Sequence, residues 1–457
     1  MSELLHPDIP ASSADHPVCR LARELGEKHP PTDEQVRVAD HALGPMLVVA
    51  GAGSGKTSTM GLRVAHLIAE QQVQPEEILG LTFTRKATSN LAAKIRHILT
   101  QLGARHGVQF TTQPTISTYS SFAASVARDF GVRLGFNPEA QLITDAHAHM
   151  LMRQIVANAE GNYELLHVLD ERSVDYIATR ARTFAAALRD NLYAVDQARA
   201  ELLAHGRAIA ETLVGDGGKS ARHAVARALT VLLNRDKGTG RFIPLPLVPL
   251  AEQACCAKSD DAQVIYAIMA RYMLLDFVAA YEEEKRNQGL VEFADQTAIA
   301  TEVAKLEDVR ALMRERYRLV LLDEFQDTST TQLSLLSRLF GQGHAVTAVG
   351  DPHQSIYGWR GASAQALQQF TTDFSSPANP VVVRPLTVAF RNSTSILDAA
   401  NHIVRPLRDA CAVEVQPLRH RSVLTGGAGS NDEGQVVIHS CLNRASEAVD
   451  VARLIAH

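Results

Sequence analysis

The 457-residue sequence predicts an α/β fold built around a parallel β-sheet. Short apolar runs typical of buried strands alternate with helical segments in the first and last thirds of the chain, which indicates a sheet covered by helices on both faces. A glycine-rich loop joins the first strand to its helix, and a long helical stretch interrupts the alternation. Because single cores rarely exceed about 250–300 residues, we expect more than one domain.

The first domain is expected to begin over residues 21–120, after a polar, proline-broken leader at residues 1–20 that we expect to be disordered. Helices are expected between its strands, as in other alternating α/β proteins. The predicted strands are the runs MLVVAG, ILGLTF and TISTY, at residues 46–51, 78–83 and 115–119.

The middle of the chain, residues 121–285, is rich in Ala, Leu and Arg at helical spacing and predicts an all-helical insertion. GDGGKS and DKGTGRFIPLPLVP are expected to be loops inside it. The first domain returns over residues 286–380 with the strands YRLVLLDEF and HAVTAVGD. A second, incomplete α/β domain is expected over residues 381–457, with the strand VVVRPL, the helix FRNSTSILDAANHIV, the strand QVVIHSC and the helix SEAVDVARLIAH.

The composition excludes several classes of protein. With 46% hydrophobic and 21% charged residues the chain is an ordinary globular protein. Its net charge of −5 neither indicates nor excludes nucleic-acid binding, since a basic groove can exist on an acidic chain. The five cysteines lack metal-ligand spacing and indicate reduced thiols in the cytoplasm. No apolar run is long enough to predict a membrane span.

The segment AGAGSGKT lies between a predicted strand and a predicted helix, the context that a phosphate loop requires. Its glycines let backbone N–H groups surround phosphate oxygens, and the helix N-terminus adds partial positive charge. Lys56 is expected to reach the β- and γ-phosphates of ATP, and the Thr57 hydroxyl to bind Mg²⁺. A glycine-rich turn that serves only packing is the alternative. The predicted ATP-binding residues here are Ala50, Gly51, Ala52, Gly53, Ser54, Gly55, Lys56 and Thr57.

Two adjacent carboxylates end the apolar strand VLLDEFQD. In an open parallel sheet, ligands bind at the carboxyl ends of the strands. Asp323 is therefore expected to hold Mg²⁺ and Glu324 to activate the attacking water as a general base. A solvated Asp-Glu turn is the alternative for this pair taken alone.

With Lys56-Thr57, DEFQD at residues 323–327 and GDPHQSIYGWRGA at residues 350–362 in this order, the chain resembles the UvrD/Rep/PcrA group of superfamily 1 DNA helicases. The resemblance covers about residues 30–457 apart from the helical insertion. It implies a P-loop NTPase with RecA-like sheets: motor domain 1A, the helical insertion 1B and the start of motor domain 2A. LGLTFTRKATSNL and RYRLVLLDEFQDTSTTQ are most similar to the AdnB-type motor of actinobacterial helicase-nucleases.

The resemblance assigns further nucleotide contacts. It implies that Gln35 reads adenine and that Phe390 stacks on it. Gln354 matches a glutamine that senses the γ-phosphate and links it to the DNA site, and Arg391 matches an arginine finger from domain 2A. Ser58 belongs to the predicted ATP site but stands where many relatives have an arginine over the second face of adenine.

The resemblance also assigns a DNA-binding set. Phe83, Tyr357 and Trp359 match aromatic side chains that contact DNA, and Arg360 and Tyr119 complete the predicted set. Aromatic platforms with a neighbouring Arg suit single-stranded DNA of any sequence, because every base has a π-face. A loop tryptophan packed against a neighbouring domain is the alternative for Trp359, the only tryptophan.

The activity implied is ATP-driven 3′-to-5′ translocation on single-stranded DNA and unwinding at single–double-strand junctions, in DNA repair or recombination, in the bacterial cytoplasm at the nucleoid. The family's later motifs do not appear before His457, so we expect an N-terminal fragment that does not unwind DNA by itself. One alternative is an ATP-binding DNA platform, or a silent motor subunit with a helicase-nuclease partner. Another is a P-loop ATPase that is not a motor.

Overall fold

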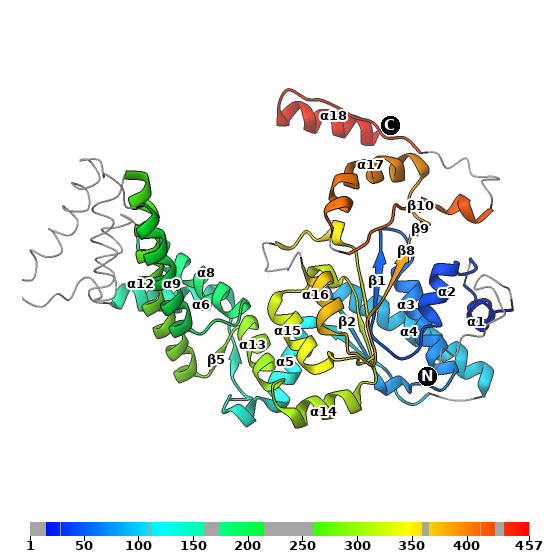
Figure 1. The fold of residues 1–457 in the computed structure, drawn as a ribbon, viewed down its shortest axis with the longest axis horizontal. Coiled ribbons are helices and arrows are strands. Elements are labelled where there is room, and N and C mark those ends of the chain that lie inside the picture. Colours follow the sequence, from blue (N-terminus) through cyan, green and yellow to red (C-terminus); the bar gives the residue numbers. More distant parts are fainter. Residues whose placement is uncertain are drawn as a thin grey trace, which may run out of the picture.

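The computed structural model describes residues 15–27, 29–107, 110–159, 173–213, 259–358, 365–411, 413–425 and 434–456. Its centre is a six-stranded parallel sheet in the order β3-β2-β6-β7-β1-β8 (Figure 1). The parallel sheet confirms the predicted fold class and brings the carboxyl ends of the strands to one edge. The strands are β1 Met46–Ala50, β2 Ile78–Thr82, β3 Thr115–Thr118, β6 Leu319–Leu322, β7 Val346–Gly350 and β8 Val382–Leu386.

Helices cover both faces of the sheet, as predicted. Alternate strand residues point to opposite faces, so Leu47 and Val49 enter one hydrophobic core and Met46 and Val48 the other. The first core is completed by α5 Tyr119–Phe130, α13 Phe293–Val303, α14 Glu307–Arg316, α15 Thr330–Phe340 and α16 Ala366–Asp373. The second is completed by α1 Pro17–Glu24, α2 Asp33–Ala39, α3 Lys56–Ala69 and α4 Arg85–His106.

The N-terminal part of the second core corrects one prediction. The expected disordered leader ran through residue 20, but helix α1 begins at Pro17, with the His16 side chain accepting a hydrogen bond from the backbone N–H of Val18. Val18 is fully buried against the sheet core. Burial of this apolar face explains why the segment is ordered despite its prolines. Residues 1–14 lie outside the described residues.

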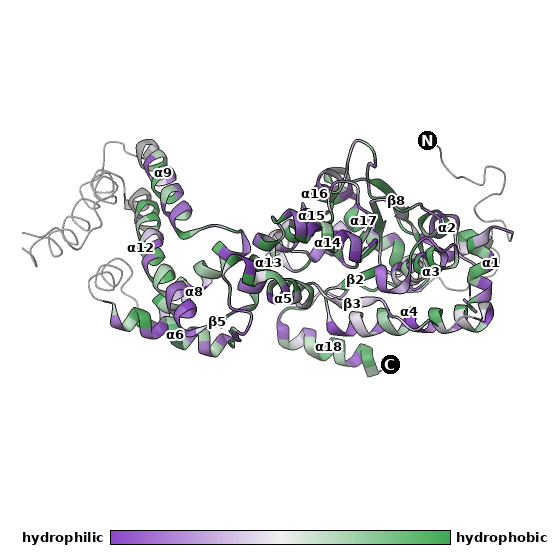
Figure 2. Ribbon diagram, turned by 90° about the horizontal axis from the view of Figure 1, so that it is seen from below, coloured by the Kyte–Doolittle hydropathy of each residue, from purple (hydrophilic) through white to green (hydrophobic). Residues whose placement is uncertain are grey.

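The helical insertion lies beside the sheet, at the opposite end of the molecule from α1 and α2 (Figures 1 and 2). It has a core of its own, which includes residues from Ile143 to Leu290, and a short sheet of β4 Gln141–Leu142 and β5 Leu290–Val291 at its base. Helix α5, which we expected at its start, instead packs in the sheet core. The two expected loops lie outside the described residues. The insertion's helices are α6 Asp145–Asn158, α8 Val174–Asp190, α9 Val195–Leu213 and α12 Ser259–Gln288.

One helix of the described residues is long and apolar enough, by length and composition alone, to cross a membrane: the part of α12 from Gln263 to Gln288. More than half of its most apolar window, 59%, is buried inside the protein. Met269, Met273 and Phe277 on this helix belong to the core of the insertion. Packing against neighbouring helices therefore accounts for its apolar composition.

The expected second domain is only partly separate from the first. The strand predicted to open it, β8, pairs along its length with β1 and is the edge strand of the first sheet. A separate two-stranded parallel sheet follows, β9 Val388–Ala389 with β10 Arg419–His420, together with α17 Thr394–Ala410 and α18 Arg444–Ala456. The predicted strand QVVIHSC is not a strand: it has no partner strand among the described residues, and Ile438 in it is 91% exposed.

Candidate active site

The glycine-rich loop turns between β1 and α3, where the sequence predicts it. Gly53 and Gly55 have φ angles of 79° and 84°, in the left-handed region that favours glycine. Gly55 precedes α3, and no side chain of the described residues caps that helix end, so the first N–H groups of α3 are not occupied by a cap. Such a helix N-terminus attracts phosphate. The loop has the local geometry expected for holding phosphates.

The side chains of the loop have different surroundings. Ala50 and Ser54 are buried, and the Ser54 hydroxyl donates to the Gly51 carbonyl at 2.9 Å, so they shape the loop from inside. Ala52 and Thr57 are exposed, which leaves the Thr57 hydroxyl accessible to a ligand or metal ion.

The acidic strand end meets the phosphate loop. Lys56 Nζ lies 3.0 Å from Glu324 Oε2. The same carboxylate oxygen accepts a hydrogen bond from Gln326 Nε2 at 2.8 Å. Glu324 itself has a φ of 48°, an unusual conformation for a residue with a side chain, which indicates local strain where the chain turns out of β6. The structure thus joins two motifs that lie far apart in the sequence.

Carboxylates are crowded at this strand end. Burial, followed by the neighbouring charge of Glu324, raises the pKa of Asp323 to about 6, while Lys56 acts in the opposite direction. The same two causes raise the pKa of Asp327 to about 6. A divalent cation held by Asp323 and Thr57 fits this set of oxygens, because its charge would offset the crowding.

A chain of hydrogen bonds leads from Glu324 to Gln354. Gln326, which donates to Glu324, accepts through Oε1 from the backbone N–H of Asp351 at 3.1 Å. Asp351 Oδ2 in turn accepts from Gln354 Nε2 at 2.7 Å. A Cβ at Gly350 would lie 2.8 Å from Gln326 Oε1, so this position requires glycine for the close approach. The predicted sensor glutamine is therefore linked to the predicted general base through two side chains.

The segment after β8 lies directly on the phosphate loop. The backbone N–H of Phe390 donates to the Gly53 carbonyl at 2.9 Å. A Cβ at Gly53 would come within 2.8 Å of Arg391 Cβ, so only glycine allows this contact. The structure thus brings Arg391 beside the loop, and its role as an arginine finger stays a prediction.

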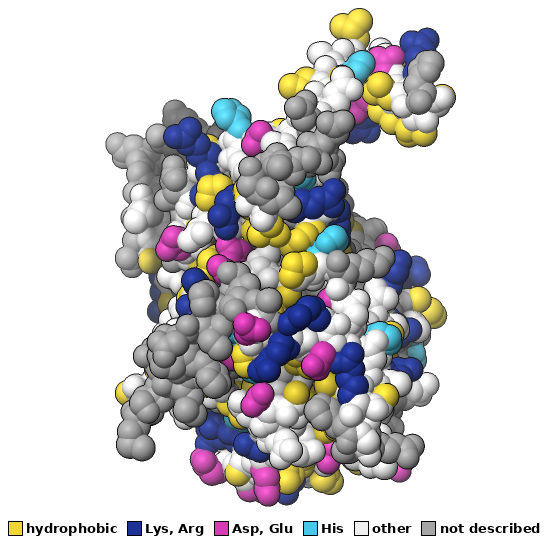
Figure 3. Space-filling view, turned by 90° about the vertical axis from the view of Figure 1, so that its right-hand side faces the viewer, with side chains coloured by type: hydrophobic (Ala, Val, Ile, Leu, Met, Phe, Trp, Pro, Cys, Tyr) yellow, Lys and Arg dark blue, Asp and Glu magenta, His cyan; other side chains and the backbone are white. Residues whose placement is uncertain are grey.

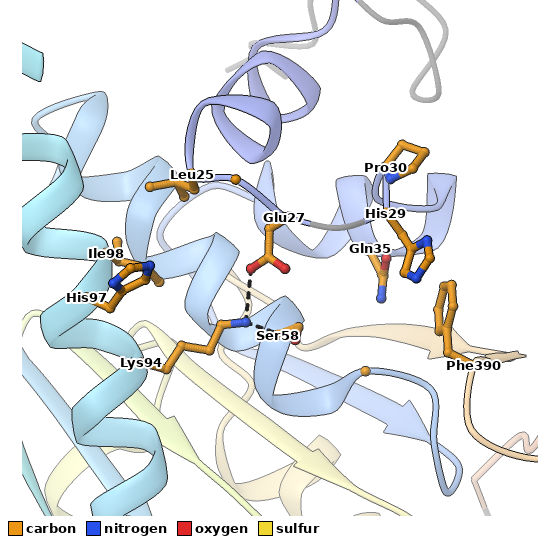
Figure 4. Close-up of a pocket in the computed structure, with 12 residues that line it drawn as sticks. Leu25, Glu27, His29, Pro30, Gln35, Ser58, Lys94, His97, Ile98 and Phe390 are labelled. Atoms are coloured by element: carbon orange, nitrogen blue, oxygen red, sulfur yellow. Dashed lines mark hydrogen bonds and ion pairs between the residues drawn. The ribbon is translucent and has the colours of Figure 1, made fainter.

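A cavity of about 490 Å³ opens beside the loop and contains the predicted adenine residues (Figure 4). Gln35, Ser58 and Phe390 all line it. Gln35 Nε2 donates to the Ser54 carbonyl at 3.3 Å, and its Oε1 accepts from the backbone N–H of Thr32 at 3.0 Å, which holds the amide between α2 and the phosphate loop. The volume falls in the range of small-molecule sites.

Sequence reasoning missed several residues of this cavity. His29 and Phe390 stack at one side, with ring centroids 6.2 Å apart and an interplanar angle of 22°. Lys94 Nζ lies 3.0 Å from Glu27 Oε1 and 2.9 Å from Ser58 Oγ (Figure 4). No pattern near His29 or Lys94 in the sequence indicates these contacts, which join segments far apart in the chain.

The predicted DNA-binding residues divide into three groups. Phe83 and Tyr357 lie together, with ring centroids 4.7 Å apart, and their DNA contact stays a prediction. Tyr119 corrects its prediction: it is 3% exposed and its hydroxyl donates to the Asp323 carbonyl at 2.9 Å, so its ring does not lie on the surface. Trp359 and Arg360 lie outside the described residues.

The surface at the end of the molecule that carries α1 and α2 shows basic and acidic side chains side by side (Figure 3). Over the described residues of this face no uniformly basic stripe is visible. This mixture agrees with the net charge of −5 and gives this face no electrostatic footprint for DNA.

Comparison with known proteins identifies the family of the chain. Residues 31–375 match the UvrD/REP helicase N-terminal domain. The chain is 24% identical over 430 residues to a DNA helicase II of Rickettsia typhi, which covers 93% of this chain and 50% of that protein. It is 26% identical over 427 residues to the DNA helicase II of Haemophilus influenzae, covering 93% of this chain and 45% of that protein. It is 24% identical over 375 residues to the ATP-dependent DNA helicase PcrA of Leuconostoc citreum, covering 81% and 38%.

The chain thus spans about half the length, or less, of these relatives. The matched helicase domain, in contrast, covers most of this chain and includes the phosphate loop, the acidic strand end and Gln354. On this match, the chain belongs to the UvrD/REP helicase family.

Proposed function

We propose that this chain is the ATP-binding part of a DNA helicase that moves along single-stranded DNA in the 3′-to-5′ direction. The ion pair between Lys56 and Glu324 carries the proposal, because it brings the predicted phosphate ligand and the predicted general base to one point. If the glycine-rich turn served only packing, or if Asp323 and Glu324 were only a solvated turn, nothing would require the phosphate loop and the acidic strand end to be in contact.

In the proposed reaction Lys56 leaves Glu324 and binds the β- and γ-phosphates. Glu324 then accepts the proton of the attacking water, and Arg391 stabilises the charge that develops on the γ-phosphate. Bound Mg²⁺ would supply additional positive charge at the phosphates. After the Lys56 contact is lost, Glu324 Oε2 still accepts the hydrogen bond from Gln326, so a change at the γ-phosphate can pass through Gln326 and Asp351 to Gln354.

The DNA strand is proposed to lie over Phe83 and Tyr357, and Trp359 and Arg360, which lie outside the described residues, are proposed as further DNA contacts. Phe83 follows β2, and Tyr357 follows β7 and the helical turn that contains Gln354. Gln354 is therefore close in the chain to Tyr357, which in turn contacts Phe83. This supports coupling between ATP and DNA.

The test is DNA-stimulated ATP hydrolysis, measured with the full-length protein and with this chain. We expect stimulation by oligo-dT in the full-length protein, loss of turnover in Lys56→Ala, and no unwinding by this chain alone. DNA binding without hydrolysis in the full-length protein would support the silent platform instead. Hydrolysis that ignores DNA would indicate a P-loop ATPase that is not a motor.

Partners and location follow from the same proposal. Single-stranded DNA and single–double-strand junctions are the proposed substrates, and a helicase-nuclease subunit is a further proposed partner. A role in repair or recombination in the bacterial cytoplasm, at the nucleoid, completes the proposal.

A further inference from the structure

The cavity beside the phosphate loop has two unlike sides. Figure 4 shows His29, Phe390 and Gln35 together at one side, and Lys94, Glu27 and Ser58 at the other. The first side presents two aromatic rings, and the second presents an ion pair. The chemistry of each side indicates whether it can stack on a base.

The ion-pair side is closed by contacts within the protein. Lys94 Nζ binds both Glu27 and Ser58, and the side chains of Lys94 and Glu27 are only 25% and 34% exposed. Ser58 is too short to cover the face of a base. The stacking surface for a base must therefore come from the other side of the cavity.

The aromatic side provides such a surface. The rings of His29 and Phe390 are nearly parallel, at 22°, with centroids 6.2 Å apart. A third flat ring between them needs about 7 Å, two van der Waals layers of about 3.5 Å each. The ring centroids are 6.2 Å apart, so one ring must move outward before a base can lie between them.

His29 is the ring that can make this movement. It is exposed, and its ring makes no hydrogen bond or ion pair with the protein in the part of the chain that the structure describes. The backbone of Phe390, in contrast, is held by its N–H, which donates to the Gly53 carbonyl of the phosphate loop. A nucleotide with its phosphates on the loop would therefore place its base near the ring of Phe390.

We propose that His29 stacks on the face of the nucleotide base opposite Phe390, and so is a nucleotide-binding residue of this chain. Gln35 lines the cavity beside His29, and its amide donates to the Ser54 carbonyl of the phosphate loop (Figure 4). The inference rests on the proposed ATP binding. It adds a base contact on the side of the cavity opposite Ser58.

The experiment compares a ligand with a base to one without. Titration calorimetry with this chain measures affinity for Mg-ATP and for Mg-tripolyphosphate in the unchanged protein, His29→Ala and His29→Phe. We expect His29→Ala to weaken Mg-ATP binding by about 5- to 100-fold, the value of one base–aromatic stack, and to leave tripolyphosphate binding unchanged. His29→Phe should restore Mg-ATP binding, because it restores a ring.

His147→Ala is the matched control, since His147 is an exposed histidine of the helical insertion. Unchanged Mg-ATP affinity in His29→Ala, or equal loss for both ligands, would overturn the stacking role while the proposed function stands. If the unchanged chain binds neither ligand, the proposed function fails and the stacking role fails with it.

Discussion

Substitution of Glu324 by glutamine separates nucleotide binding from hydrolysis. In the structure Lys56 is held by Glu324 at 3.0 Å, so ATP must displace this carboxylate before Lys56 can bind phosphate. Glutamine keeps the shape of the side chain and can still accept from Gln326 through its amide oxygen. We therefore expect Glu324→Gln to bind Mg-ATP more tightly and to hydrolyse it far more slowly.

The size of the binding effect follows from the exposure of the pair. The side chains of Lys56 and Glu324 are 13% and 34% exposed, so solvent screens the pair in part. Such a pair contributes about 1 kcal/mol, at the upper end for screened ion pairs. Removing it should tighten Mg-ATP binding about fivefold, since about 1.4 kcal/mol is a factor of ten. Loss of the Glu324 charge also removes one cause of the raised pKa of Asp323, which favours a bound cation.

Hydrolysis should fall in the same variant by about 10²- to 10⁴-fold, the usual contribution of a general base. Binding is measured by calorimetry with this chain, and turnover with the full-length protein and oligo-dT. Glu302→Gln is the control, because Glu302 pairs with Lys305 on the surface within one helix turn. Weaker Mg-ATP binding in Glu324→Gln, or near-normal turnover, would refute the reasoning.

Three further predictions concern other parts of the molecule. Burial, followed by the charge of Arg63, lowers the pKa of His41 from 6.5 to about 4. As the pH falls, His41 is therefore protonated in the unfolded chain before it is protonated in the folded protein, and the free energy of unfolding decreases between pH 6.5 and 4. His41→Gln should reduce the loss of unfolding free energy between pH 7 and 5 by about 1–2 kcal/mol in urea titrations; an unchanged loss would contradict it. Tyr119→Phe removes the hydrogen bond to the Asp323 carbonyl and should lower the unfolding free energy by about 1 kcal/mol without changing DNA affinity. Oligo-dT should quench the fluorescence of Trp359, the only tryptophan, and Trp359→Ala should weaken DNA binding by about 1–3 kcal/mol; emission indifferent to saturating DNA would contradict this.

The sheet and the meeting of its two motifs could be predicted from the sequence. Apolar runs predict the buried strands. The glycine-rich loop follows the carboxyl end of β1, and the Asp323-Glu324 pair follows that of β6. Parallel strands bring such ends to one edge, so both motifs are expected there, whereas the 3.0 Å contact of Lys56 with Glu324 depends on how the two side chains are placed. The hydrogen bonds from the Asp351 N–H to Gln326 and from Gln354 to Asp351 depend on side-chain rotamers, and no spacing in the sequence encodes them.

Two wrong predictions had signals in the sequence. Tyr119, Phe122, Ala123 and Val126 recur at helical spacing and all face the core, which places Tyr119 inside. In β8, Pro385 lacks an N–H and is tolerated in an edge strand, where one side needs no ladder hydrogen bond. The proline thus agrees with β8 as the edge of the first sheet. The stack of His29 on Phe390 had no such signal, because it joins segments far apart in the chain.

Phe390 connects the proposed base cavity directly to the phosphate loop. Its ring lines the base cavity, its backbone N–H is bound to the Gly53 carbonyl of the phosphate loop, and the next residue is Arg391. A base that stacks on this ring therefore acts on the same short segment that carries the proposed arginine finger. Gly53 and Arg391 are packed so closely that no side chain fits at Gly53. A shift of the Phe390–Arg391 segment would therefore change its contact with the phosphate loop. If Phe390 and Arg391 have the proposed roles, recognition of the base and placement of the arginine depend on one short segment, and substitutions at His29 that move the ring of Phe390 should also alter turnover.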